Sequence, residues 1–227
     1  MRAGESFEVK KRELIHLIRE HVAPYFPDLT LCDLTLYAQP IDSILRGICF
    51  LPHLRSPENF RVSAIAFPLF VPSGGAGTGW SRQIRRGILD PRDVWSLQDF
   101  ESAPRRAVLV KRIRANVGIL PSLAEPIEVG RKIKYGVFRG NRDWEDFKVG
   151  LCYAKAGRIS DAMAHIRKIL NRKRDRPAPG NLLEDALLIA PLLEAKDTVG
   201  IQMLLDGWQA RTIEQLKTCG FKPREWE

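Results

Sequence analysis

Residues 146–170 read DFKVGLCYAKAGRISDAMAHIRKIL, and this stretch predicts two short helices folded back on each other. We expect the first helix from about Trp144 to Ala156 and the second from about Ser160 to Leu170. Gly157 stands between them, where a left-handed backbone can end the first helix, and Ser160 is the expected N-cap of the second. Small residues at the crossing let the two backbones approach closely: Gly150, Ala154 and Ala162.

The order of small and large side chains in this hairpin resembles one tetratricopeptide repeat. The small residue, the aromatic, the turn glycine, the small crossing residue and the large apolar residue of that pattern are Gly150, Tyr153, Gly157, Ala162 and Ile166. Ile169 stands where the family has a later alanine, and Pro177 comes a few residues late for its closing proline. A single repeat does not build the superhelix of a repeat array. The resemblance, over roughly an eighth of the chain, therefore implies a hairpin docked on the rest of the protein.

A chain of 227 residues is long enough for one large domain or two small ones. Its hydrophobic content of 44% and its charged content of 28% are ordinary for a globular protein. No apolar run reaches transmembrane length, and the first residues are followed by a charged amphipathic segment. We therefore expect no signal peptide, no membrane partner and a cytoplasmic location.

The residues that usually mark a metal site or a catalytic site are scattered along this sequence. The four cysteines never form a C-x-x-C pair, which favours reduced thiols without a metal: Cys32, Cys49, Cys152 and Cys219. Residues 73–79 are rich in glycine, but Trp80 stands where a phosphate-binding loop needs lysine. His53 and His165 have no nucleophile or carboxylate partner at a recognisable spacing. We expect no metal, no cofactor and no enzymatic activity, although an active site assembled from distant segments stays open.

Hydrophobic periodicity predicts an α+β fold in two parts. Residues 1–143 are expected to form an N-terminal helix and a small, mostly antiparallel sheet with packed helices. Residues 144–227 are expected to be all-helical. The predicted helices outside the hairpin are Phe7–Val22, Ala103–Gly118, Leu182–Ala195 and Thr198–Lys217, and the predicted strands are Leu29–Tyr37, Ile44–Leu51 and Phe60–Val71. In element order alone, the N-terminal part loosely resembles small bacterial α/β families, some of them linked to toxin-immunity loci.

A basic segment precedes the hairpin in a chain whose net charge is +9. Residues 131–142 read RKIKYGVFRGNR, with five cations and no acid. Ile133, Tyr135 and Val137 alternate with the lysines, which predicts a short strand or an extended loop. Cations interleaved with aromatics are typical of nucleic-acid-binding surfaces. With a second basic segment after Trp80, the candidate partner-binding residues are Arg82, Arg85, Arg86, Arg131, Lys132, Lys134, Tyr135, Arg139 and Arg142.

These observations leave three hypotheses for the function. The leading one is a cytoplasmic, non-enzymatic protein-binding module, whose sharpest form is an immunity-type protein that neutralises an acidic partner. The second is a nucleic-acid-binding protein that uses residues 131–142 together with Arg82, Arg85 and Arg86. The third is an enzyme of an unrecognised type. A neighbouring gene for a secreted toxin would favour the first hypothesis, and a transposon or phage operon the second.

Overall fold

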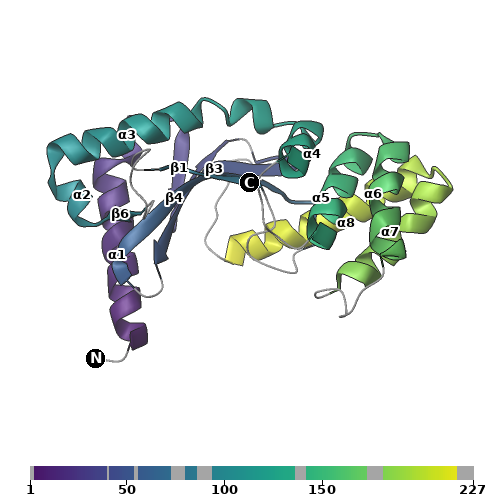
Figure 1. Cartoon of the computed structure of the whole chain (residues 1–227), viewed down its shortest axis with the longest axis horizontal. Coiled ribbons are helices and arrows are strands. Elements are labelled where there is room, and N and C mark those ends of the chain that lie inside the picture. Colours follow the sequence, from purple (N-terminus) through teal and green to yellow (C-terminus); the bar gives the residue numbers. More distant parts are fainter. Residues whose placement is uncertain are drawn as a thin grey trace.

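An antiparallel sheet with helices packed around it gives the protein an α+β fold, seen here in a computed structural model (Figure 1). The structure describes residues 3–39, 41–53, 56–72, 80–85, 94–135, 142–172 and 181–218. Side chains are described for most of these residues, but not for residues 3–9, 57, 80, 134 and 135. The predicted fold class is confirmed, with a helical C-terminal part following a part that holds the sheet.

Within the described ranges, six strands form one sheet in the order β1-β2-β3-β4-β5, and β6 pairs with β4 beyond the end of β5. Every pairing is antiparallel. The strands are β1 (Leu29–Cys32), β2 (Thr35–Ala38), β3 (Ile44–His53), β4 (Ser56–Pro68), β5 (Trp80–Gln83) and β6 (Trp95–Ser96).

The first predicted strand, Leu29–Tyr37, is wrong as a single element. Asp33 adopts a left-handed backbone conformation with φ 47°, so the chain reverses there and Cys32 pairs with Thr35. Asp tolerates this conformation better than most residues, because its short polar side chain can hydrogen-bond locally. The other two predicted strands form, and both extend further into the connection between β3 and β4 than the sequence indicated. At its other end β4 stops at Pro68, three residues before the predicted end at Val71.

Helices pack against one face of the sheet. They are α1 (Ala3–His21), α2 (Gln98–Glu101), α3 (Ala103–Val117) and α4 (Pro126–Tyr135), with 3₁₀ turns at Ala23–Tyr25 and Pro121–Leu123. Alternate residues of β4 point into this layer, so Phe60, Val62 and Ala64 are fully buried against apolar side chains of the helices. Arg46 also points to this side, where its guanidinium lies 3.5 Å from the carbonyl oxygen of Leu120.

The predicted hairpin is present as α5 (Arg142–Lys155) and α6 (Ile159–Asn171). Gly157 has φ 74°, as a left-handed helix end requires. A Cβ atom at Gly150 would lie 3.1 Å from Ile166 Cδ1, so the two helices cross closely at this glycine. The predicted N-cap is wrong: Arg158 occupies the cap position, and no side chain caps the helix.

Two more helices complete the C-terminal part, namely α7 (Leu182–Glu194) and α8 (Thr198–Thr218). In Figure 1, α8 runs from the helical end of the molecule back to the sheet. There Ile213 and Leu216 pack on the second face of the sheet, against Tyr37 and Leu45, while Gln209 donates to the carbonyl of Asp42 at 3.2 Å. One continuous apolar cluster also joins both parts, from Leu14 to Trp208. A domain boundary near residue 143 stays a prediction.

Candidate interaction surfaces

The residues predicted to bind a partner that the structure describes fall on three elements. Arg82 and Arg85 lie exposed on and just after the edge strand β5. Arg131 and Lys132 are exposed on α4, and Arg142 is exposed at the start of α5. Lys134 and Tyr135 are the last two residues of α4, and the structure describes their backbone but not their side chains. Arg86, Arg139 and the rest of residues 136–141 lie outside the described residues.

The prediction of a strand or extended loop at residues 131–135 is wrong, because these residues form the second half of α4. Val129 and Ile133, four residues apart, share the buried face of this helix. A Cβ atom at Gly130 would lie 2.9 Å from Cys152 Cβ, so α4 packs directly on α5 through this glycine. Helical spacing leaves Arg131 and Lys132 on the solvent side, and Arg131 pairs with Glu128 at 2.6 Å.

A stronger concentration of positive charge lies on α3, whose residues are not among those predicted to bind a partner. This helix has 15 residues, of which five are cations and none is an acid: Arg105, Arg106, Lys111, Arg112 and Arg114. Leu109, Val110 and Ile113 bury its inner face. Arg106 donates to the carbonyl of Phe100 at 2.7 Å, and Arg105 lies 3.6 Å from the buried carboxylate of Asp99.

The other three cations of α3 are exposed, and within the described ranges none of them forms an ion pair. At 100° per residue, Arg105 and Arg112 share one edge of the exposed face, while Lys111 and Arg114 share the other. Val108 lies between the two edges and is 44% exposed. We call this surface the α3 basic face, defined by Arg105, Val108, Lys111, Arg112 and Arg114.

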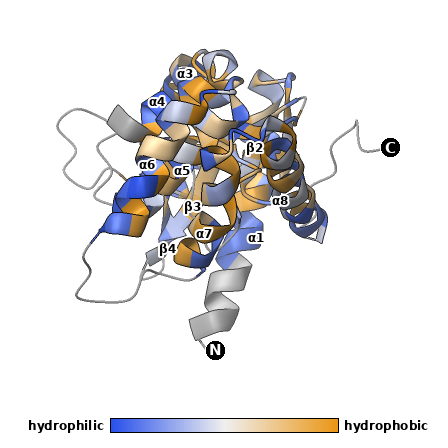
Figure 2. Cartoon of the chain, turned by 90° about the vertical axis from the view of Figure 1, so that its right-hand side faces the viewer, coloured by the Kyte–Doolittle hydropathy of each residue, from blue (hydrophilic) through white to orange (hydrophobic). Residues whose placement is uncertain are grey.

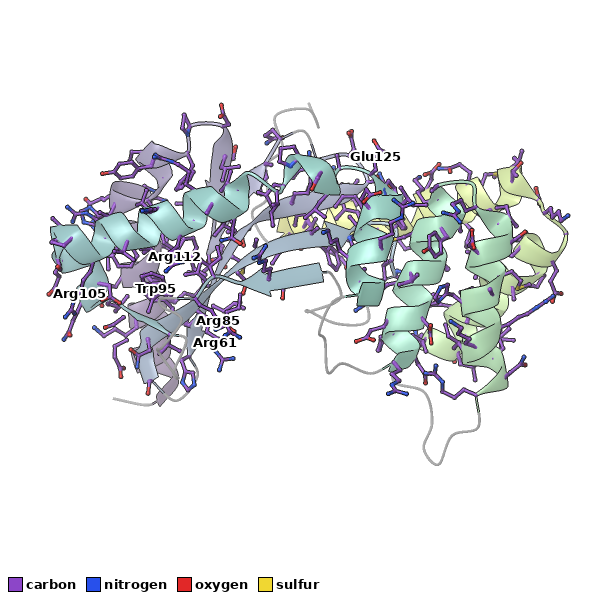
Figure 3. The ribbon with its side chains drawn as sticks, turned by 45° about the horizontal axis from the view of Figure 1, so that its top comes forward. Arg61, Arg85, Trp95, Arg105, Arg112 and Glu125 are labelled. Atoms are coloured by element: carbon purple, nitrogen blue, oxygen red, sulfur yellow. The ribbon has the colours of Figure 1, made fainter. Side chains whose placement is uncertain are left out.

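Two more exposed arginines, Arg61 and Arg85, lie on the sheet near Trp95 (Figure 3). Phe60, Val62 and Ile84 point toward the helical layer, so their neighbours Arg61 and Arg85 point to the face of the sheet that lies away from α3. The indole of Trp95 donates to the carbonyl of Ile84 at 3.0 Å, and Ile84 in turn donates to Val62 at 2.7 Å. These bonds fix Arg61 and Arg85 next to the position of Trp95.

The opposite end of the molecule carries an apolar surface on α7 and α8. Four of its large side chains are exposed to solvent: Leu187 (57%), Leu188 (57%), Val199 (68%) and Met203 (71%). The chain turns between the two helices at residues 195–197, and a Cβ atom at Gly200 would lie 3.0 Å from Leu192 Cδ2. The end of α7 and the start of α8 therefore lie side by side. We call these four side chains the α7–α8 apolar face.

The composition of α7 explains why this face is unusual. Its sequence LLEDALLIAPLLE buries Leu182, Ala186, Ile189, Ala190 and Leu193, and still has leucines left for the outer side. The helix carries three acids and no cation. In Figure 2, where this end of the molecule faces the viewer, α7 appears mostly in the hydrophobic colour. The sequence prediction placed this helix correctly but did not identify its outer side as a surface feature.

A network of charged side chains ties α5 to α6. Arg172, just after α6, donates to Asp146 at 2.7 Å and pairs with Asp143. His165 Nδ1 lies 2.9 Å from Asp146 Oδ1, and Lys168 Nζ lies 3.7 Å from the same oxygen. The acids stand in the first turns of α5 and the cations near the end of α6, where the helix dipoles favour them. These contacts hold α5 against α6, and this structural role is enough to explain the network. We call it the clasp of the hairpin.

The absence of a carboxylate partner for His165, expected from spacing, is thus wrong. Its partner Asp146 is 19 residues earlier in the chain, and only the antiparallel crossing of α5 and α6 brings the two together. A histidine held by a carboxylate can serve as a general base. However, His165 is buried and packs against the ring of Tyr153 with centroids 5.6 Å apart. The geometry therefore supports the clasp.

Lys148 is the other unusual ionisable group of the hairpin. Its side chain is only 7% exposed, and desolvation by burial lowers its pKa from the usual 10.5 to about 8. Glu145, one helical turn earlier, opposes this shift because its negative charge favours the ammonium form. Burial in turn raises the pKa of the Cys152 thiol well above its usual range. A thiol with a raised pKa is a poor nucleophile or metal ligand.

Two kinds of site are absent from the described ranges. No group of three or more His, Cys, Asp or Glu side chains is arranged there to hold a metal ion. Cys32, Cys49 and Cys152 are free thiols, and Cys219 lies outside those ranges. None of the helices that the structure describes is long and apolar enough to cross a bilayer.

Comparisons with protein-family models, with curated proteins and with solved structures find no match to this chain. The function must therefore be inferred from the surfaces described above. The molecule is polarised, with the α3 basic face on the part that holds the sheet and the α7–α8 apolar face at the helical end.

Proposed function

We propose that this protein is a protein-binding module and that the α7–α8 apolar face is its contact surface. The observation that carries this proposal is the exposure of Leu187, Leu188, Val199 and Met203, each at least 57% accessible to solvent. Contiguous apolar patches on monomeric proteins are limited in size, and larger ones mark interaction sites. Burying one such side chain stabilises a complex by roughly 1.5–3 kcal/mol, before the cost of association.

Folding of this part of the chain does not require these four side chains to be apolar. Ile189 and Leu193 on α7, with Ile201, Leu205 and Trp208 on α8, already fill the interior. Polar residues at the four exposed positions would be at least as compatible with solvent. A binding role accounts for their apolar character, whereas packing within this chain does not.

The charges around the face indicate the chemistry of its partner. Glu184, Asp185 and Glu194 belong to α7, which has no cation. Burial raises the pKa of Asp185, the neighbouring Glu184 adds to this shift, and Arg211 of α8 opposes it. A surface with an apolar centre and cations at its rim would complement this arrangement. The acidic partner expected from the net charge would instead have to meet the basic side of the molecule.

An immunity-type role remains the sharpest form of this proposal. It requires a protein target and no catalytic set, and it predicts that a toxin gene lies beside the gene for this chain. The wide separation of the two surfaces would let one protein contact a target through the apolar face while the basic face stays accessible.

The test places a photo-crosslinking amino acid at Met203 and identifies the proteins captured in the native host by mass spectrometry. We compare three proteins that carry this crosslinker: the otherwise unchanged chain, Leu188→Glu and Tyr25→Glu. Tyr25 is an aromatic residue that is 50% exposed and lies outside α7 and α8, so Tyr25→Glu is the matched control. We expect one protein to be captured stoichiometrically, lost in Leu188→Glu and retained in Tyr25→Glu. Capture that is the same in both variants, or absent altogether, would refute the proposal. Circular dichroism verifies that both variants are folded.

A further inference from the structure

We propose that the α3 basic face binds double-stranded DNA, with α3 lying along the major groove and its two cationic edges against the two phosphate strands. This inference goes beyond the proposed function, because it concerns a different surface and a different class of partner. It also differs from the prediction that placed nucleic-acid binding at residues 131–142.

The distribution of charge on α3 carries the first step. Arg105 and Arg112 lie on one edge of its exposed face, and Lys111 and Arg114 lie on the other. Cations on both edges suit a ligand with two parallel rows of negative charge, as the phosphate strands on either side of a DNA groove provide. The nearest acids along the chain, Asp99 and Glu101, come before the helix begins.

The centre of the face carries the second step. Pro104, Val108 and Ala115 stand between the cationic edges, and all three are uncharged and exposed. An α-helix with its side chains is about 10–12 Å wide, and the major groove of B-DNA is about 12 Å wide. Small residues at the centre let the helix enter the groove. They offer no hydrogen bonds to base edges, so binding should depend on phosphate contacts and tolerate changes of sequence.

Arg61 and Arg85 take no part in this surface. Phe60, Val62 and Ile84 point into the helical layer, so their neighbours Arg61 and Arg85 point to the opposite face of the sheet. The proposed DNA contact therefore rests on α3 itself.

Geometry also separates duplex DNA from other polyanions. The major groove of A-form RNA is deep and too narrow for side chains to read, so α3 could not enter it. An acidic polypeptide has no pair of charged rows at the spacing of a groove. Both ligands are therefore included as arms of the test.

The experiment measures binding of the full chain to a labelled duplex of about 20 base pairs by fluorescence anisotropy, at salt concentrations from about 50 to 200 mM. The double variant Arg112→Ala, Arg114→Ala removes one cation from each edge. The matched control, Arg12→Ala with Arg19→Ala, removes two exposed arginines from α1 and changes the net charge equally. Val108→Glu places a carboxylate at the centre of the face, with Tyr25→Glu as its control.

We expect the α3 double variant to bind DNA at least about tenfold more weakly, with the slope of log K against log salt reduced by about 1.8, or about 0.9 for each lost phosphate contact. Val108→Glu should weaken binding similarly, and both controls should stay within about twofold of the unchanged chain. The RNA duplex and a polyglutamate chain should bind at least about tenfold more weakly than DNA.

Four results would overturn the inference. They are an absence of DNA binding, an equal loss in the α1 control, equal affinity for the RNA duplex or polyglutamate, and a loss that follows Arg131→Ala with Lys132→Ala while the α3 variant binds normally. The last result would return the site to α4. Failure of this experiment leaves the crosslinking result at Met203 unaffected, because the two surfaces share no residue.

Discussion

Replacing Lys148 by Met should stabilise the folded protein. Lys148 lies on α5 with a side chain that is only 7% exposed, and its ammonium group loses most of its hydration on folding. Methionine has a similar length, carries no charge and adapts to irregular cavities. Replacing a buried charge by an apolar side chain of similar volume is often stabilising.

The magnitude follows from the pKa of Lys148. Burial lowers this pKa from 10.5 to about 8. Each pH unit of difference corresponds to about 1.4 kcal/mol, so the buried ammonium destabilises the folded state by about 3 kcal/mol below pH 8. The Oε1 atom of Glu145 is buried without a hydrogen-bond partner among the described residues. Removing the Lys148 cation takes a favourable positive charge away from this carboxylate, which reduces the gain in stability. We therefore expect a gain of between about 1 and 3 kcal/mol at pH 7.

The pH dependence gives the sharper test. Between about pH 8 and pH 10.5 the unfolded chain keeps its proton on Lys148 while the folded chain releases it, so the stability contributed by this site rises with pH. The advantage of Lys148→Met should consequently be constant below about pH 8 and shrink toward pH 10.5. Effects of the cysteines at high pH are shared by both proteins and largely cancel in the comparison.

Urea unfolding followed by circular dichroism at pH 7, 8, 9 and 10 measures the difference. Lys132→Met, at an exposed position on α4, is the control and should change stability by less than about 0.5 kcal/mol at every pH. The reasoning would be refuted if Lys148→Met were less stable than the unchanged chain at pH 7. It would also be refuted if a gain at pH 7 persisted undiminished at pH 10.

Three further predictions concern the hairpin and are measured by the same unfolding assay. Gly157→Val should cost about 1–2 kcal/mol of stability, because a φ of 74° strains a β-branched residue. No atom lies within 4 Å of a Cβ at this position, so the cost comes from the backbone, and Gly157→Asn should cost much less. Equal losses in the two variants would exclude backbone strain as the cause. Ala162→Trp should cost about 1–3 kcal/mol by overpacking a fully buried position, and an unchanged stability would mean that the crossing is looser than described. Asp146→Asn should cost about 1–3 kcal/mol of stability, because it weakens the contacts of Asp146 with Arg172 and His165. Asp161→Asn, at an exposed position, should cost less than half as much. Equal effects would show that the clasp contributes no more than a surface ion pair.

Residues 131–135 show how tertiary contacts decided against a local pattern. Ile133 alternates with lysines, which reads as a strand when the segment is taken alone. In the folded chain, Gly130 packs on Cys152 and Val129 lies beside Ile133 on one buried helical face. A short apolar pattern is compatible with both periods, and the partner surface on α5 selects the helical one.

The α7–α8 apolar face and the α3 basic face could not be predicted from the sequence for a related reason. The leucines of α7 predict a helix, but they do not say which of them will lack a neighbour. That depends on where α6 and α8 end up. The absence of acids in α3 could have been seen in the sequence. Its meaning needed the packing of Leu109, Val110 and Ile113, which directs the cations outward on two edges.

What the sequence by itself determined are the features that depend on nearby residues. These are the α+β class, the long helices, the two main strands and the hairpin with its left-handed Gly157, since periodicity and backbone preference act over a few residues. Only the tertiary structure decided the helical state of α4, the pairing of His165 with Asp146 and the exposure of the α7–α8 apolar face. Each of these depends on contacts between segments distant in the chain, and burial against a particular neighbour then outweighs local preference.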